Sequence, residues 1–383
     1  MNRTNQQRYP RADAPDSTTR LDREAALRHQ NCAAAPCQQD RAAALRNQDR
    51  AAALRHPRGR RSDRRSSADR HRPRGTSLVA LLAVVVGLTA AACSNEKPKR
   101  PTMSPLEFDA RVNAILAELP DDTVAISIRD PHSGFNYDRN ADRLFHAAST
   151  MKVPVMIEVF RQADLGVFNL DDSLIVENAF SSIVDGSPYS MDIGEDSDES
   201  VYGAIGTAMS IRDLIHQMIT RSSNLATNLL IDLVSADSVQ QTIRRLGTTR
   251  MEVLRGVEDL KAFDLGMNNT ATSADLAVLL EAIANGEAVS DEADAEMVAI
   301  LSEQEFNEMI PAGLPEGTIV AHKTGSITRI SHDAAIVSPD DAPWVIVILT
   351  EGFDDQGESF AVGQELARLA WSAVRAGNEG MKE

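Results

Sequence analysis

Hydrophobic and polar positions divide the chain beyond residue 105 into segments with helical spacing and segments that alternate. Leu106–Leu119 carries its apolar residues at helical spacing, whereas Thr123–Arg129 alternates as a strand does. The turn at Pro131–Gly134 introduces a second short strand. Met151–Gln162 is largely apolar and predicts a helix.

The same patterns describe the rest of the chain. Residues 165–310 are mostly helical in pattern, with an acidic loop at Asp192–Glu199. Three strands and a last amphipathic helix follow: Thr318–Thr324, Ser331–Val337, Trp344–Thr350 and Phe360–Ala376. We therefore expect an α/β (α+β) fold, with an antiparallel sheet flanked by terminal helices and an all-helical lobe. A site is expected where the two lobes meet.

Two polar segments precede the folded domain, which we assign to residues 105–383. Residues 94–104 predict a tether. Residues 1–75 are rich in Arg, Ala, Gln and Pro, and we predict that they are disordered. Their near-repeats, which begin at Asp22, Asp40 and Asp49, are too short and irregular to stack into a solenoid. We interpret this leader as cytosolic or as a misassigned translation start, with an RNA-binding tail as the alternative.

An export signal is predicted at residues 76–93. Arginines 70, 72 and 74 precede Leu78–Ala92, a run of fifteen uncharged residues. The run is shorter than the ~20 apolar residues that a membrane-spanning helix needs. It ends in Leu-Thr-Ala-Ala-Ala before Cys93, which resembles a bacterial lipobox with an acylated cysteine. We predict an exported lipoprotein, anchored to the membrane through Cys93 and facing the periplasm or the cell exterior. Ordinary signal cleavage and a retained anchor are the alternatives.

Charge is divided unevenly along the chain. Residues 1–93 hold 18 Arg, no Lys and 8 acidic residues. Subtraction from the totals of 39 basic and 56 acidic residues leaves 21 basic and 48 acidic residues after position 93, a balance of −27. Phosphate binding needs clustered Lys and Arg, so this balance argues against nucleic acid as a partner.

Cysteine and histidine give little indication of a metal site. The cysteines are Cys32, Cys37 and Cys93, so the folded domain holds no disulfide framework and no cysteine zinc site. The histidines form no H-x-H or H-E-x-x-H pattern, which argues against a zinc hydrolase. We expect neither a metal nor another cofactor.

Ser149 and Lys152 stand three residues apart at the start of a predicted apolar helix. This spacing puts both side chains on one helical face. The helix N-terminus adds positive potential where the serine would attack and an oxyanion would form. A serine nucleophile needs a base, and a buried lysine can be held neutral to serve as one. Alternatively, Ser149 caps the helix and Lys152 lies on the surface.

Two further motifs follow, the first 73 residues after Ser149 and the second 101 residues after the first. Ser222-Ser223-Asn224 lies at a loop-to-helix junction, and Lys323-Thr324-Gly325 ends a predicted strand. Taken singly, the first could be a helix cap and the second an edge strand with a solvated lysine. Together with the Ser149 motif, they match the S-x-x-K, S-D-N and K-T-G motifs of class A β-lactamases and penicillin-binding proteins.

On these motifs, residues 105–380 resemble class A β-lactamases and related β-lactamase-like serine hydrolases. Met209–Leu214 resembles the family's approach to its second motif, and Asn268–Leu276 resembles the stretch that closes its Ω-loop. The resemblance implies an α/β lobe and an α lobe, in agreement with the predicted segments. It also implies that Ser149 attacks a carbonyl, that Lys152 takes or relays the proton, and that Ser222 passes a proton to the leaving ring nitrogen.

The resemblance implies a substrate-binding set as well. Asn224 would bind the acyl side-chain amide and help to orient the motif lysine. Lys323, Thr324 and Ser326 would hold the substrate carboxylate, with Gly325 in the same binding motif. The backbone N–H groups of Ser149 and Ser326 would form the oxyanion hole.

Two positions depart from the family pattern. Ser223 stands where the lactamases have Asp. The Ω-loop glutamate that activates the deacylating water lies in an R-x-E-x-x-L-N arrangement, but Leu254–Lys261 has one residue more between Arg255 and Glu258 and lacks the Leu-Asn. We assign the base to Glu258, with Asp259 as a possible substitute and a solvated loop acid as the alternative.

We predict a serine hydrolase that opens β-lactams through an acyl-enzyme on Ser149. A D,D-peptidase or another amide or ester hydrolase is the alternative within the family. A catalytically silent lipoprotein that binds cell-wall peptide is the alternative outside catalysis. The expected partner is a small-molecule β-lactam or a cell-wall peptide, and we expect a monomer.

Overall fold

The computed structural model describes residues 103–120, 123–338 and 342–375. The predicted leader, the export signal with Cys93, and residues 94–102 of the tether lie outside this range. Within it, no helix combines the length and the apolar character needed to cross a membrane.

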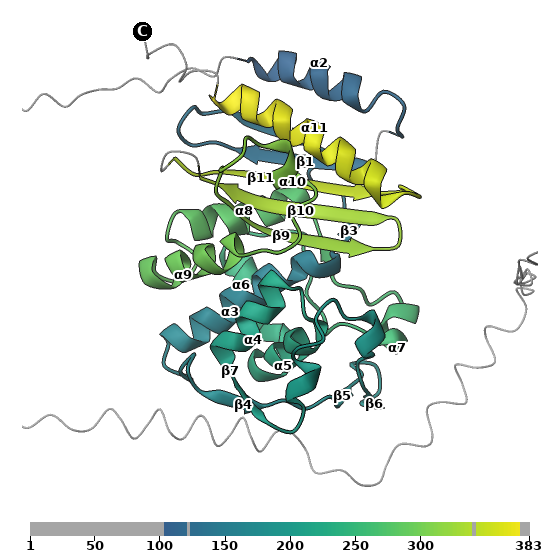
Figure 1. Ribbon diagram of the computed structural model, residues 1–383, viewed down its shortest axis with the longest axis vertical. Helices are drawn as coiled ribbons and strands as arrows, with labels where there is room; N and C mark the ends of the chain where they lie inside the picture. Colours follow the sequence, from purple (N-terminus) through teal and green to yellow (C-terminus); the bar gives the residue numbers. More distant parts are fainter. Residues whose placement is uncertain (1–102, 121–122, 339–341, 376–383) are drawn as a thin grey trace, which may run out of the picture. The chain divides into compact units, whose positions relative to one another are not determined.

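The main sheet of the described chain is antiparallel and joins its first strands to its last. Its spatial order is β2-β1-β11-β10-β9 (Figure 1). The strands are β1 (Val124–Arg129), β2 (Asn136–Arg139), β9 (Val320–Ile327), β10 (Ile330–Val337) and β11 (Trp344–Glu351). β1 pairs with β11 over its whole length, from Val124 opposite Thr350 to Arg129 opposite Val345. The predicted antiparallel sheet is confirmed.

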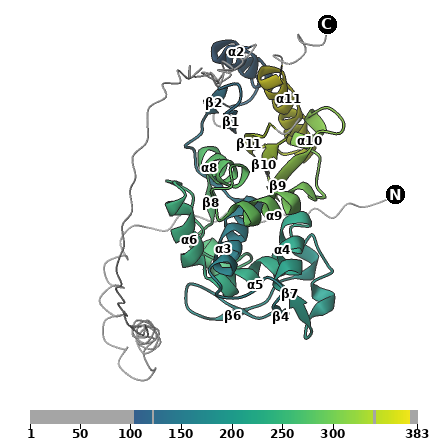
Figure 2. The ribbon, with the colours of Figure 1, turned by 90° about the vertical axis from the view of Figure 1, so that its left-hand side faces the viewer.

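The sheet is buried on both faces because its apolar side chains alternate between two hydrophobic clusters. In β11, Ile346 and Ile348 belong to one cluster, and Val345 and Val347 belong to the other. The first face is covered by the terminal helices α2 (Pro105–Ile115) and α11 (Gln356–Arg375). The second face packs against α8 (Ser273–Ala284) and α9 (Asp291–Ser302) (Figure 2).

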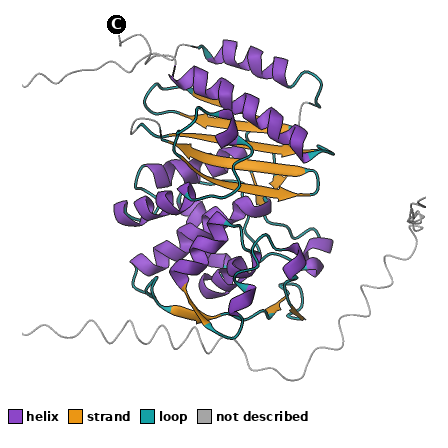
Figure 3. Ribbon diagram, in the orientation of Figure 1, coloured by secondary structure: helices purple, strands orange, loops and turns teal. Residues whose placement is uncertain are grey.

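A helical lobe lies on the α8 and α9 side of the sheet (Figure 3). Its helices are α3 (Lys152–Asp164), α4 (Ile211–Thr220), α5 (Asn224–Val234), α6 (Ala236–Arg245) and α7 (Leu260–Asp264), and the short α10 (Ile310–Gly313) follows α9. The nucleophile segment enters α3 through a 3₁₀ turn, η1 (Ala148–Met151). The two lobes are those that the hydrophobic pattern predicts.

The prediction of a mostly helical centre is wrong for residues 165–210. This segment holds 3₁₀ turns and short strand pairs: η2 (Ile193–Glu195), η3 (Tyr202–Ala204), β4 (Ser173–Ile175) with β7 (Ala208–Ser210), and β5 (Phe180–Ser181) with β6 (Pro188–Tyr189). β3 (Phe145–His146) pairs elsewhere with β8 (Thr270–Ala271). Aspartate side chains bind nearby backbone N–H groups, as Asp192 does at Gly194 and Asp198 at Ser200. Such local bonds compete with helix formation.

The burial of β11 predicts a stability difference between two isoleucines. Ile348 is fully buried, so Ile348→Ala is expected to lower the free energy of unfolding by about 2–5 kcal/mol. Ile319 is 59% exposed, so Ile319→Ala is expected to change it by no more than about 0.5 kcal/mol. Denaturant unfolding of both variants measures the difference. Equal losses would contradict the assigned position of β11 in the core.

Candidate active site

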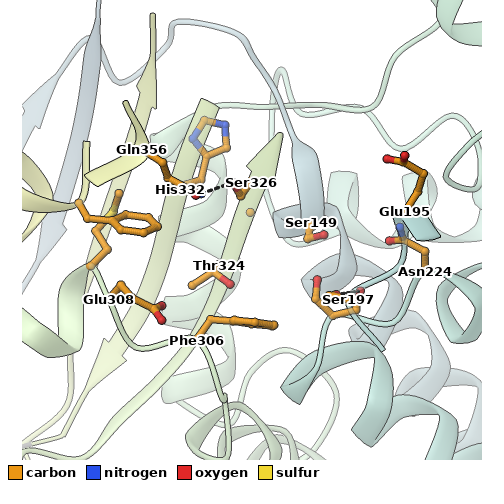
Figure 4. Close-up of a pocket in the computed structure, with 14 residues that line it drawn as sticks. Ser149, Glu195, Ser197, Asn224, Phe306, Glu308, Thr324, Ser326, His332 and Gln356 are labelled. Carbon is orange, nitrogen blue, oxygen red and sulfur yellow. Dashed lines mark hydrogen bonds between the residues drawn. The ribbon is translucent and has the colours of Figure 1, made fainter. Parts of the chain in front are cut away.

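Three segments that are distant in sequence meet between the lobes (Figure 4). The η1 turn supplies Ser149, and Lys152 begins α3. Ser222 lies in the turn before α5, and Asn224 is the first residue of that helix. β9 supplies Lys323 from the edge of the sheet. The structure therefore brings together the three motifs that the sequence singles out.

The amine of Lys152 is the point at which these segments are joined. Lys152 is fully buried, and its Nζ lies 3.1 Å from Ser149 Oγ and 2.9 Å from Asn224 Oδ1. It also donates to the backbone oxygen of Ser222 at 2.5 Å and lies 3.1 Å from Ser222 Oγ. The alternative of a surface lysine is wrong. A buried amine needs such acceptors, because an unpaired polar group in the interior is costly.

Burial also changes the protonation of both lysines. It lowers the pKa of Lys152 to about 7, although the carboxylates of Asp196 and Glu258 oppose the shift. Burial, and then the positive charge of Lys152, lower the pKa of Lys323 well below its usual range. Lys152 can therefore be neutral near physiological pH, as a base for a serine hydroxyl must be.

Ser222 links the two lysines through its hydroxyl oxygen. Lys323 Nζ donates to Ser222 Oγ at 3.1 Å and to the backbone oxygen of Thr324 at 3.0 Å. A hydroxyl oxygen accepts two hydrogen bonds and donates one. With Lys152 and Lys323 as donors, the hydrogen of Ser222 is available to a group in the cleft. Ser222 can thus pass a proton onward while two amines lie at its oxygen.

Three residues around the candidate active site have strained backbone conformations. Ala148, Ser222 and Glu258 have φ values of 44°, 60° and 60°, in the left-handed region that residues other than glycine seldom adopt. These three residues come directly before the nucleophile, at the second motif and at the Ω-loop acid. Strain of this kind persists where the surrounding structure fixes the backbone, and it is common at functional sites.

Gly325 allows the sheet to approach the nucleophile. A Cβ at this position would lie 3.0 Å from the Ser149 nitrogen and 3.1 Å from the Thr150 nitrogen. The prediction that the Lys323 motif ends its strand is wrong, because β9 continues to Ile327, which pairs with Ile330 of β10. Thr324 is half-buried and the following Ser326 is exposed at the cleft.

The second motif is supported from two directions. Ser223 Oγ accepts from the Ala226 nitrogen at 3.3 Å, so the helix-cap interpretation holds for Ser223. The carboxylate of Asp196 accepts from the Asn224 nitrogen at 2.9 Å and from the Leu225 nitrogen at 3.0 Å. Sequence reasoning recognised the acidic loop only as an interruption and missed the role of Asp196. A carboxylate at a helix N-terminus is favourable, so Asp196 stabilises the helix that presents Asn224.

Glu258 lies beside the second motif and Asp259 does not. Glu258 Oε1 accepts from Asn224 Nδ2 at 3.2 Å, and Oε2 accepts from the Asp192 nitrogen at 3.0 Å. Desolvation by burial raises the pKa of Glu258 above its usual range. Asp259 instead accepts from Ser182 Oγ at 2.8 Å and from the Ala262 nitrogen at the start of α7. Of the two acids, Glu258 is therefore the one that shares a partner with Lys152.

The longer Ω-loop is accommodated by a close contact with α5. Asn228 Oδ1 accepts from the Val257 nitrogen at 2.7 Å, and Asn228 Nδ2 donates to the Val257 oxygen at 3.0 Å. A Cβ on Gly256 would lie 2.5 Å from Asn228 Oδ1, so a larger residue there would displace the side chain that holds Val257. Arg255 is buried and donates to the backbone oxygen of Met267, which closes the base of the loop.

Ser149, Ser222 and Asn224 line a cleft of about 380 Å³, together with Thr324, Gly325 and Ser326 of β9; this volume is within the range of small-molecule sites. Sequence reasoning missed several residues of its lining, because they come from loops and helix ends without a motif: Glu195, Ser197, Phe306, Glu308, Met309, His332, Gln356 and Phe360. Burial lowers the pKa of His332 to about 4, so this histidine is neutral at pH 7. The described residues contain no cluster of acids, histidines or cysteines suited to a metal ion.

Comparisons with known proteins agree with this geometry. A family model described as the β-lactamase enzyme family matches residues 107–374. A β-lactamase of Rhodobacter capsulatus is 26% identical over 67% of this chain and 84% of its own length. β-Lactamase AST-1 of Nocardia asteroides is 27% identical over 80% of this chain and 96% of its own length.

Solved structures give the same result for the fold. A β-lactamase from Sphaerobacter thermophilus superposes with a TM-score of 0.61 and 29% identity, over 71% of this chain and 98% of that one. The structure of PBP-A superposes with a TM-score of 0.59 over 72% of this chain and 98% of that one. At 24% identity, the second likeness shows the fold alone.

The lowered pKa of Lys152 predicts a pH dependence of acylation. We predict that the neutral amine acts as the base, so the second-order acylation rate should fall about tenfold per pH unit below about pH 7, where Lys152 becomes protonated. Stopped-flow measurement with a chromogenic cephalosporin gives this profile. An acid limb near the ordinary pKa of a carboxyl group would show that Lys152 does not control the step.

The contact of Gly325 with the nucleophile turn predicts a specific loss. Gly325→Ala is expected to slow acylation by about tenfold to a hundredfold, because its Cβ meets the Ser149 backbone and displaces it. Gly203→Ala is the control, since a Cβ on Gly203 meets nothing within 4 Å. Acylation rates of the two variants are compared by mass spectrometry. Equal rates would contradict the contact.

Proposed function

The chain belongs to the β-lactamase enzyme family, and we propose that it opens β-lactam rings through an acyl-enzyme on Ser149. The observation that carries the proposal is the buried Lys152 amine, within 3.1 Å of Ser149 Oγ and Ser222 Oγ and 2.9 Å from Asn224. This arrangement pairs a nucleophile with an adjacent base and a relay hydroxyl. The substrate class, β-lactams, is the one that the family's name indicates. The roles of Ser149, Lys152 and Ser222 are part of our proposal.

Acylation uses the groups around Lys152. Ser149 Oγ attacks the lactam carbonyl while the neutral Lys152 amine takes its proton. The C–N bond of the ring then breaks, and Ser222 gives its proton to the leaving nitrogen. Ser222 is in turn reprotonated from Lys152, whose Nζ lies 3.1 Å away. The protons therefore balance, and Lys152 is neutral again when the acyl-enzyme has formed.

Binding groups hold the substrate on either side of the nucleophile. Backbone N–H groups of Ser149 and Ser326 stabilise the carbonyl oxygen as it gains charge. Asn224 binds the amide of the acyl side chain. Lys323 and Thr324 receive the ring carboxylate, together with Ser326 on the same strand. The amine of Lys323 already bonds to the Thr324 carbonyl and Ser222 Oγ, which supports a fixed position for it.

Deacylation requires a second base. Glu258 accepts a proton from water as that water attacks the acyl carbon. The bond from the acyl carbon to Ser149 Oγ then breaks, and the proton held by Glu258 passes to Ser149 Oγ, so that both residues return to their starting states. The hydrogen bond from Asn224 to Glu258, together with the bond from Lys152 to Asn224, supports this assignment. Burial raises the pKa of Glu258, which makes its carboxylate a stronger base toward water.

Family members are generally exported, and we propose that this chain reaches the cell exterior as a lipoprotein. The support is the uncharged run before Cys93. In this proposal residues 76–93 form the signal, residues 94–104 form the tether, and residues 105–383 form the hydrolase domain.

The Glu258 assignment predicts a trapped intermediate. Glu258→Gln is expected to accumulate an acyl-enzyme on Ser149 and to lower turnover of a penicillin by at least about 10²-fold, because the general base is lost. Acylation by a chromogenic cephalosporin should change little. Mass spectrometry of the intact protein detects the adduct. Asp259→Asn is the control, because that carboxylate bonds to Ser182 and the start of α7.

The outcomes separate the possible functions. Turnover by Glu258→Gln together with stalling by Asp259→Asn would assign the base to Asp259. A wild-type protein that labels in a burst and then stalls is a D,D-peptidase-like enzyme. The absence of any adduct on wild-type Ser149 at high penicillin concentration would leave a silent protein that binds cell-wall peptide.

The anchor predicts a change of compartment. Cys93→Ala should release the protein from the membrane fraction, because the acylated residue is lost, and globomycin should accumulate an unprocessed precursor of the wild type. Fractionation followed by immunoblotting measures both. Unchanged membrane association of Cys93→Ala would show that the anchor is not a lipid on this cysteine.

A further inference from the structure

The charged side chains that line the cleft in the described chain are both acidic. They are Glu195 and Glu308, and both side chains are exposed. Neither forms an ion pair with another described residue. Figure 4 shows Glu195 beside Asn224, and Glu308 on the opposite side near Thr324 and Phe306. Both carboxylates are thus available to a bound molecule.

The cations of the site, Lys152 and Lys323, lie behind the cleft, and the proposed mechanism already uses them for the nucleophile and for the ring carboxylate. Lys152 and Lys323 are fully buried, and their amines donate to the serine, asparagine and backbone oxygens described above. The ring of His332 is held by the backbone at both nitrogens, through the His146 oxygen and the Thr350 nitrogen. Among the described residues that line the cleft, none presents a free cation to balance the two acids.

Glu195 lies on the acyl side of the proposed site. It ends η2 in the acidic loop, whose next residue, Asp196, binds the N-terminus of α5 at Asn224. The charge of Glu195 contributes to the raised pKa of Glu258, so its carboxylate is close enough to act on charges in the centre. Phe306, Met309 and Phe360 make other parts of the lining apolar, which weakens the screening of charge by water.

We propose that the cleft selects acyl donors that carry a protonated amine in the acyl side chain, which Glu195 binds, and disfavours donors that carry an additional negative charge there. This inference rests on the proposed acylation of Ser149 and on the assignment of the acyl side chain to the Asn224 side. The acidic character of the chain after residue 93 acts in the same direction, because a negative field raises the local concentration of cations.

Three penicillins provide a matched charge series at one carbon of the acyl side chain. Ampicillin has an amine there, benzylpenicillin has hydrogen, and carbenicillin has a carboxylate. At about pH 6.5, below the ordinary pKa of an α-amino group, the ampicillin amine is largely protonated. The second-order rate constant for acylation of Ser149 should fall in the order ampicillin, benzylpenicillin, carbenicillin. Each step should amount to about twofold to fivefold at low salt, since an exposed charge pair contributes at most about 1 kcal/mol.

Salt and one substitution test the cause. The ratios should shrink in about 1 M KCl, where the Debye length is about 3 Å. Glu195→Gln should bring the ampicillin and benzylpenicillin rate constants close together and raise that of carbenicillin. Glu118→Gln is the control, because it removes the same charge from an exposed position after α2, outside the cleft. It should leave the order unchanged.

A second variant separates the two acids. Glu308 lies near Thr324, where the ring carboxylate shared by all three penicillins would bind. Glu308→Gln should therefore raise the three rate constants by a similar factor and preserve their ratios. Loss of the charge preference in Glu308→Gln, with its retention in Glu195→Gln, would overturn the assignment to Glu195.

The measurement distinguishes this inference from the function on which it rests. Acylation of Ser149 by all three penicillins at equal rates, or in the reverse order, would overturn the charge selection and leave the proposed function standing. A failure of all three to form an adduct would overturn the proposed function, and the inference with it. The expected order, abolished by Glu195→Gln alone, supports both.

Discussion

The burial of one amine determines the arrangement of this site. Lys152 is removed from solvent at the start of an apolar helix, and its Nζ must find acceptors inside the protein. It finds them on Ser149, three positions earlier, and on Ser222 and Asn224, 70 and 72 positions later. The same burial that requires these partners also lowers the pKa of the amine toward neutrality. Assembly of the site and activation of its base therefore have a common cause.

The surrounding structure holds the segments that carry those partners, through side chains that bond to their backbone and through one close approach of a glycine. Asp196 fixes the N-terminus of α5, Asn228 clamps the loop that carries Glu258, and Gly325 lets β9 pass against the nucleophile turn. Each contact depends on a small or hydrogen-bonding side chain at a single position. Positive φ values at Ser222 and Glu258 indicate that this framework overrides local backbone preference.

The sequence predicts the parts of this structure that depend on repeating patterns. β1 and β11 are apolar along almost their whole length because both faces of the sheet are buried. The spacing of Ser149 and Lys152 predicts that their side chains lie close together, and the two polar atoms are 3.1 Å apart. The backbone path of residues 165–210 was not predictable in this way. It depends on aspartate carboxylates that accept hydrogen bonds from nearby backbone N–H groups, and such bonds leave no periodic pattern in the sequence. The carboxylate of Glu258 bonds to Asn224 and that of Asp259 bonds to Ser182, and the sequence does not predict this difference between two adjacent acids.

The pairing of β1 with β11 has a consequence for how the protein folds. Val124 finds its partner, Thr350, only 226 positions later, and until then β1 can pair with β2 alone. Closing so long a loop costs entropy before any of its contacts form, and topologies dominated by distant pairings fold slowly. During synthesis the nucleophile turn emerges early, but the strand that approaches it and the centre of the sheet emerge last. A chain cut short before β11 has every residue of the catalytic motifs but lacks the central strand that joins β1 and β2 to β10 and β9, so it should be inactive.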